Sequence, residues 1–146
     1  MGYLIQNTDI IKTVVTIPEA TVQVMDSSAP ITLVATNNLF IAAPIACFIV
    51  MQANQTTPYI GFNHLHLTNS NNYGVGDLCA TYAINASLTN NLQYPGAYSM
   101  LCNFQSAPNR FGGVYAPKNL EIFFDIAPTA GDGDMTVILY YTRITI

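Results

Sequence analysis

Two β-rich runs near the C-terminus decide the fold: NLEIFFDI at 119–126 and MTVILYYTRI at 135–144. The segment between them contains Pro128, Gly131 and the step Asp132-Gly133. An Asp-Gly step between apolar runs is a strong hairpin signal, because these residues tolerate positive φ. The sequence therefore predicts a long antiparallel hairpin that closes the fold.

Side chains alternate between the two faces of a strand, so the pattern of each run shows which faces are apolar. The first run has one apolar face and one largely polar face. The last run is apolar on both faces, with Met135, Val137, Leu139 and Tyr141 on one and Ile138, Tyr140 and Ile144 on the other. One face can fill the core of the domain, whereas the second needs another partner.

Other β-rich runs precede this pair and are separated by turn-forming residues. They span 10–17, 21–25, 31–35, 45–51, 59–67, 78–84 and 98–104. Pro44 lies inside the longer apolar run 39–51, and we expect a bend there. No stretch has sustained helical periodicity. An all-β fold of eight or nine short strands follows, either a sandwich or a barrel.

Eight strands in two packed sheets is the number found in a jelly roll, so we expect a single jelly-roll β-sandwich. An immunoglobulin-like sandwich is the main competitor. The chain has no tryptophan, which disfavours the antibody type without excluding the wider class. With 146 residues and no linker or internal repeat, the chain predicts one domain over 10–146, preceded by a short N-terminal segment, 1–9.

The composition favours a protein held in an assembly. Charged residues make up 8% of the chain, against about 25% in average soluble domains. A free monomer normally carries more charge for solubility. A monomer with a neutral surface rich in Asn and Thr is the alternative, since apolar side chains also cover much ordinary surface.

Charge and hydropathy argue against two classes of partner. The formal net charge is −4, and nucleic-acid binding needs clustered basic residues. The four basic residues are instead far apart: Lys12, Arg110, Lys118 and Arg143. The most apolar run, 39–51, is shorter than the roughly 20 residues that span a bilayer. We therefore expect neither nucleic-acid binding nor membrane insertion.

The N-terminus and the cysteines indicate synthesis in the cytosol. The first nine residues lack the basic and apolar regions of a signal peptide. Cys47, Cys79 and Cys102 have no metal-binding spacing and cannot all pair within one chain. We expect them to be reduced and buried.

One motif resembles part of a metal site. His64 and His66 occupy positions i and i+2 of an expected strand, so their side chains share a face. Neither a glutamate a few residues later nor a third histidine follows. The pair is interpreted as packed or hydrogen-bonded in preference to metal-binding, and no cofactor is expected. Three chains around a threefold axis, each contributing two histidines, would be another way to build a metal site.

Other candidate chemistry is weaker. The turn 131–134 lacks the glutamate that an EF-hand loop requires. No serine or cysteine pairs persuasively with a histidine and a carboxylate, so we expect no enzymatic activity. Four tyrosines in or next to expected loops could stack on sugars: Tyr59, Tyr73, Tyr94 and Tyr115. A glycan-binding head domain, as in an adhesin or lectin, is therefore the alternative function.

The C-terminal pattern resembles a known class of protein. NLEI at 119–122, GDGDMTV at 131–137 and YYTRI at 140–144 resemble small jelly-roll virion proteins of bacteriophages with a trimeric, tumour necrosis factor-like arrangement. A weaker likeness extends over 22–35. Such proteins serve as head fibre, decoration or vertex components of the capsid.

The resemblance implies a structural subunit of a virion, made in the host cytosol and assembled as a homotrimer with other virion proteins. In such a trimer we expect Phe123, Ile138, Tyr140 and Ile144 to face neighbouring subunits. The core would contain Leu120, Ile122, Phe124, Val137 and Leu139, although the two faces could be exchanged. The segment 1–9 is then either an arm that docks on a neighbour or a frayed end.

Overall fold

The structure is a computed structural model that describes residues 9–37, 39–62, 64–69, 79–80, 91–92, 96–102 and 119–145. Nearly all of its regular elements are strands, which confirms the all-β prediction. The elements are β1 (Ile11–Ile17), α1 (Glu19–Val22), β2 (Ile31–Val34), β3 (Phe40–Met51), β4 (Tyr59–Ile60), β5 (Leu65–Asn69), β6 (Cys79–Ala80), β7 (Asn91–Leu92), β8 (Ala97–Cys102), β9 (Leu120–Phe124) and β10 (Met135–Thr145). In the described part of the chain, no helix is long and apolar enough to cross a bilayer.

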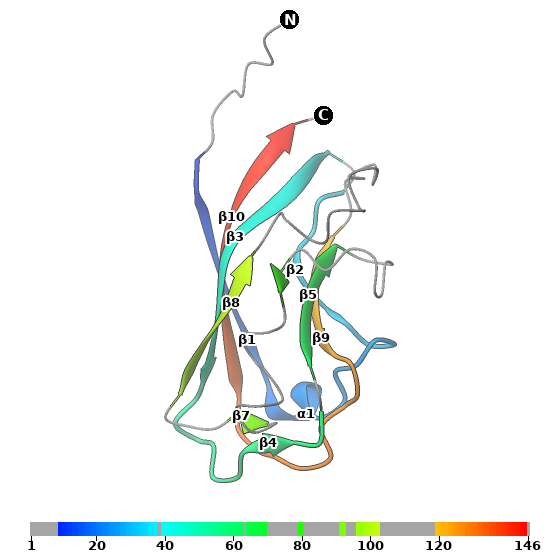
Figure 1. Ribbon diagram of the computed structural model, residues 1–146, viewed down its shortest axis with the longest axis vertical. Coiled ribbons are helices and arrows are strands. Elements are labelled where there is room, and N and C mark those ends of the chain that lie inside the picture. The colour runs from blue at the N-terminus through cyan, green and yellow to red at the C-terminus, as the bar shows by residue number, and fades with distance from the viewer. Residues whose placement is uncertain are drawn as a thin grey trace, which may run out of the picture.

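The strands form two main antiparallel sheets that face each other (Figure 1). The larger sheet has the order β1-β10-β3-β8-β6, and the smaller has the order β2-β9-β5. A short pair, β4 and β7, lies at one end of the two sheets (Figure 1).

The strand pairs are nested along the sequence. β1 pairs with β10, β2 with β9, β3 with β8, and β4 with β7, each time antiparallel. Successive pairs alternate between the larger and the smaller sheet for the first three pairs. The chain therefore has the connectivity of one long hairpin rolled up so that its two arms stay together.

The core lies between the two sheets. Val137 and Leu139 of β10 and Ile122 and Phe124 of β9 are fully buried, as is Leu120. These five residues are the ones expected in the core, and their burial confirms that expectation. Residues from outside the sheets close the core, and the ring of Phe62 packs on Phe124 with 4.5 Å between centroids.

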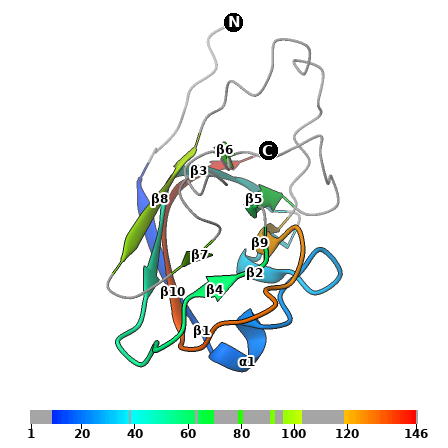
Figure 2. The same ribbon diagram turned by 60° about the horizontal axis from the view of Figure 1, so that its bottom comes forward.

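The predicted C-terminal hairpin is wrong, because β9 and β10 belong to different sheets. β9 pairs with β2 and β5, while β10 pairs with β1 and β3. The segment 125–134 crosses from one sheet to the other at the end of the molecule and passes beside β4 (Figure 2). A local Asp-Gly signal marks a change of chain direction, but it does not determine which strands pair.

The crossing segment is fixed to β4 by its backbone. The N–H of Ile60 donates to the carbonyl of Ala130 at 3.1 Å, and the N–H of Thr129 donates to the carbonyl of Ile60 at 2.9 Å. Gly131 has φ +133°, and a Cβ there would lie 2.6 Å from the Cα of Tyr59. A glycine is therefore required where the segment passes over β4.

Two aspartates of the segment bind neighbouring backbone groups. The Asp132 carboxylate accepts the N–H of Thr56 at 2.7 Å and that of Thr57 at 2.6 Å. Its hydrogen bonds, the one from the Thr56 side chain above all, lower the pKa of Asp132. Asp134 Oδ1 accepts the N–H of Glu19 at 2.9 Å, at the start of α1. The residues that suggested a hairpin turn instead join three parts of the chain.

Two predicted strands are also corrected. The run 21–25 is the end of α1 and a turn, because Val22 and Met25 are buried at a spacing of three while Val24 between them is exposed. The run 59–67 is divided into β4 and β5 at Gly61, whose φ is +90°.

The expected bend at Pro44 is a β-bulge within a continuous strand. In the register of β10 with β3, Tyr140 faces Ala46 and Tyr141 faces Pro44, so that Ile45 is the extra residue. A bulge accommodates a proline in a central strand because the ladder of hydrogen bonds is interrupted there. Of the predicted strands 78–84 and 98–104, the structure describes β6 and β8, and the segment 1–8 lies outside the described residues.

Candidate functional site

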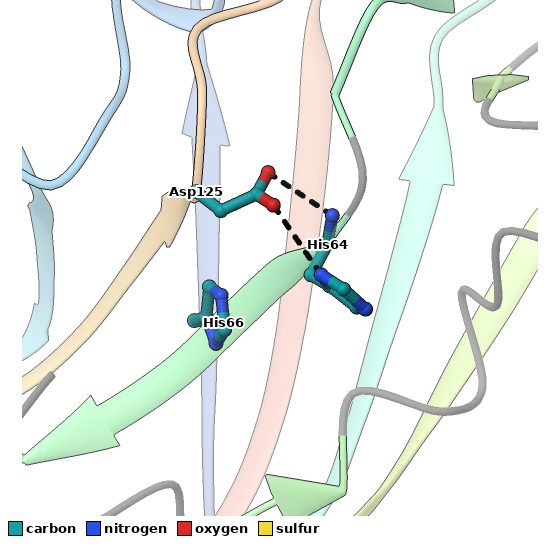
Figure 3. Close-up of side chains that lie close together, drawn as sticks. All are labelled: His64, His66 and Asp125. Carbon is teal, nitrogen blue, oxygen red and sulfur yellow. Dashed lines mark hydrogen bonds and ion pairs between the residues drawn. The ribbon is translucent and has the colours of Figure 1, made fainter. Parts of the chain in front are cut away.

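The pairing of β5 with β9 places three potential ligand residues together. Leu65 faces Phe124 and His66 faces Phe123 in the register of the two strands. Continuing that register by one residue brings Asp125 opposite His64, and the N–H of Asp125 donates to the carbonyl of His64 at 3.0 Å. His64, His66 and Asp125 thus gather at the end of β9 (Figure 3).

The aspartate contacts both the backbone and the ring of His64. Asp125 Oδ1 accepts the N–H of His64 at 3.1 Å and that of Ile126 at 2.9 Å. Asp125 Oδ2 lies 3.3 Å from His64 Nδ1. The side chains of His64 and Asp125 are 43% and 23% exposed, so the pair is half-buried and open to solvent.

The second histidine is positioned by an aromatic ring. His66 stacks on Phe123, with 5.2 Å between the centroids and 25° between the planes. The rings of His64 and His66 are 5.9 Å apart. One ligand atom from each of His64, His66 and Asp125 can be chosen so that all three lie within 4.8 Å of one another.

The sequence identified the two histidines but not the carboxylate. Asp125 is 61 residues from His64, and only the pairing of β5 with β9 brings the two together. The sequence does show an aspartate directly after the apolar run of β9. Nothing in the sequence, however, indicates which strand lies beside β9. Because the third potential ligand comes from the same chain, a metal site here would not need a threefold axis.

A second candidate surface is the outer face of the larger sheet. Val14, Ile138 and Phe48 lie in one row across β1, β10 and β3. Val14 is 54% exposed and Phe48 is 38% exposed. In the adjacent row Tyr140 contacts Phe48 edge-on, with 6.3 Å between centroids. We call the surface formed by these four residues the outer apolar face.

Charge is nearly absent around these rows. Lys12 faces Tyr140 in the register of β1 with β10, and its Nζ lies 6.0 Å from the centre of that ring. By strand alternation, Lys12 is the one charged residue on this face in the described part of the larger sheet. Ile144 extends the same face of β10 toward the end of the strand and is exposed.

The structure separates the four residues expected at a subunit interface. Ile138, Tyr140 and Ile144 share the outer face of β10 and are at least partly exposed. Phe123 lies on β9 in the other sheet, is 3% exposed and stacks on His66. Phe123 is therefore a buried residue of the histidine cluster and does not lie with the other three.

Of the four tyrosines expected to contact a glycan, the structure describes one. Tyr59 is fully buried, and its hydroxyl donates to the carbonyl of Gly133 at 2.7 Å. Burial, followed by the charges of Glu19, Asp132 and Asp134, raises the pKa of Tyr59. Tyr59 therefore fixes the crossing segment and has no surface for a sugar. The other three expected contacts lie outside the described residues: Tyr73, Tyr94 and Tyr115.

The one cysteine whose side chain the structure describes, Cys47, is on the core face of β3 and fully buried. Burial raises the pKa of Cys47 to about 12. At neutral pH this thiol stays protonated, so Cys47 is a core residue and not a nucleophile.

Comparison with known proteins identifies no family. No family model matches the chain, and no curated protein matches it. A solved structure described as the cyanophage Pam1 capsid asymmetric unit superposes with a TM-score of 0.39 and 10% sequence identity, over 93% of this chain and 85% of that chain. A likeness at this level carries no argument about function.

Proposed function

We propose that the chain is a non-enzymatic structural subunit of a virion that self-assembles as a symmetric oligomer, a trimer as the sequence resemblance implies. The observation that carries the proposal is the outer face of the larger sheet, where Val14, Phe48, Ile138 and Tyr140 present an apolar surface on three strands. A continuous exposed apolar surface of this kind is typical of an interaction site.

The strand order supports the jelly-roll part of the proposal. A jelly roll is a double-sheet fold of two Greek keys, in which the two arms of one rolled hairpin stay paired and successive pairs lie in opposite sheets. Here β1, β10, β3 and β8 form one sheet and β2, β9 and β5 the other, with nested pairs. This strand order does not favour the immunoglobulin-like competitor. In that fold the first and last strands do not form the outermost pair of a nested series.

A second copy of this chain is the partner that the outer face fits best. Within the described part of the larger sheet, this face carries a single lysine and offers little to a charged partner, since specific polar partners are selected by complementary charge. An identical copy presents the same apolar rows, and three such faces can converge on a threefold axis, where each subunit contacts the two others through heterologous contacts. The chain as a whole carries only 8% charged residues, which suits permanent assembly.

The virion assignment is tested on purified virus particles. Particles of the virus that encodes the chain would be washed in high salt and analysed by quantitative mass spectrometry. We expect the chain in a constant copy number per particle, in a multiple set by the particle's symmetry. Its presence in infected-cell lysate but not in washed particles would contradict the proposal.

A further inference from the structure

We propose that His64, His66 and Asp125 bind one divalent transition-metal cation of the zinc class. This inference does not depend on the virion assignment. It follows from a cluster that combines two imidazoles and a carboxylate from two paired strands, with one ligand atom of each within 4.8 Å of the others.

The separation of two ligand atoms already suits a metal ion. In a tetrahedral site with metal–ligand bonds of about 2.0–2.1 Å, neighbouring ligand atoms lie roughly 3.3 Å apart. His64 Nδ1 and Asp125 Oδ2 are 3.3 Å apart, a long distance for a charge-assisted hydrogen bond. All three ligand atoms lie within 4.8 Å of one another, so small side-chain movements would complete the tetrahedral geometry.

Neighbouring groups hold the ligands in orientation. Asp125 Oδ1 accepts the N–H groups of His64 and Ile126, and Oδ2 lies toward the His64 ring (Figure 3). His66 is stacked on Phe123, which is itself buried. Such outer contacts reduce the freedom that a ligand loses on binding a metal, and they raise metal affinity.

The donor set selects the class of metal. Imidazole nitrogen suits zinc, nickel, copper and cobalt, whereas calcium and magnesium prefer sites made of oxygen atoms only. Three protein ligands leave a fourth position for water or for a donor from another molecule. At 43% and 23% exposure, the side chains of His64 and Asp125 leave the site accessible to such a ligand.

Cobalt is the probe that reports both binding and ligand type. Protein without an affinity tag would be stripped with a chelator and titrated with Co²⁺, recording the visible spectrum, and with Zn²⁺ by calorimetry. We expect one metal per chain and a cobalt spectrum of low coordination number without a sulfur-to-metal charge-transfer band. A strong charge-transfer band would assign the metal to cysteines and overturn the proposal.

Two variants and one control decide which residues bind. Asp125→Asn keeps an oxygen for the backbone N–H groups while weakening the metal ligand, and His66→Gln removes one imidazole. Each should weaken Zn²⁺ binding at least about tenfold. Asp9→Asn removes an exposed carboxylate outside the cluster and should leave the affinity unchanged.

The variants must also be shown to fold, by circular dichroism and thermal unfolding. If Asp125→Asn fails to fold, His66→Gln decides, because His66 lies within β5 and not at the crossing from β9. Absence of stoichiometric binding by the parent protein would overturn the proposal. Retention of parental affinity in a folded His66→Gln variant would overturn it equally.

Discussion

Replacing Phe48 with threonine should weaken subunit association while leaving the fold intact. Phe48 is 38% exposed on the outer face of β3. An aromatic side chain buries about 150–250 Å², so the exposed part is about 60–95 Å². At about 25 cal/mol per Å², covering that area in an interface contributes about 1.5–2.5 kcal/mol per chain. Threonine favours strands and adds no charge, so the effect isolates the lost apolar area.

The dissociation constant would be measured by sedimentation velocity over a range of protein concentrations. We expect association to weaken about 10- to 50-fold for each Phe48 lost, since 1.4 kcal/mol corresponds to a factor of ten. Val24→Thr is the matched control, because Val24 is exposed and apolar but follows α1 and belongs to no strand of the larger sheet. Equal weakening in the control, or none in Phe48→Thr, would refute the assignment of this face.

Four further predictions concern the fold. Tyr59→Phe removes the hydrogen bond to the buried Gly133 carbonyl and should lower the free energy of unfolding by about 1–2 kcal/mol, measured by denaturant titration. Gly131→Ala should destabilise more than Tyr59→Phe in the same titration, because its Cβ would meet the Tyr59 backbone and φ is positive. The pKa of Asp132 is lowered from 3.8, so its contribution to stability is present above that pH and is lost as the pH falls through the folded-state pKa. Asp132→Asn should therefore flatten the dependence of the melting temperature on pH below about 4. Alkylation of Cys47, followed by peptide mass spectrometry, should occur only on unfolding, and labelling of native protein at pH 8 would contradict its burial.

The strands could be predicted from local patterns, but their pairing could not. Alternation along 119–126 and 135–144 correctly placed Ile122 and Leu139 in the core, because burial on one face follows from a period of two. Pairing depends on contacts between residues far apart in sequence, such as Val14 with Ile138. The Asp-Gly step therefore suggested a hairpin where the chain in fact changes sheets.

Short irregular elements also could not be predicted from the sequence pattern. Four residues of α1 carry too little periodicity to distinguish a helical turn from a strand, and the spacing of Val22 and Met25 became informative only once both were seen to be buried. Gly61 divides β4 from β5, yet a glycine within an apolar run equally fits a bulge.

The histidine cluster was predictable in part. Two histidines at i and i+2 share a face in any strand, so His64 and His66 could be placed together. Asp125 joins them only through the register of β5 with β9, which no local pattern encodes. Phe123 was assigned to an interface because it lies on the second face of its strand, but that face is covered and holds His66.

The most direct test of the central claim is the mass of the purified parent protein in solution, measured by light scattering during a dilution series. The outer apolar face predicts a stable oligomer, and the trimer proposal predicts three times the chain mass of 15.9 kDa. A mass of 15.9 kDa at every concentration would contradict the account, because the face formed by β1, β10 and β3 would then remain in water.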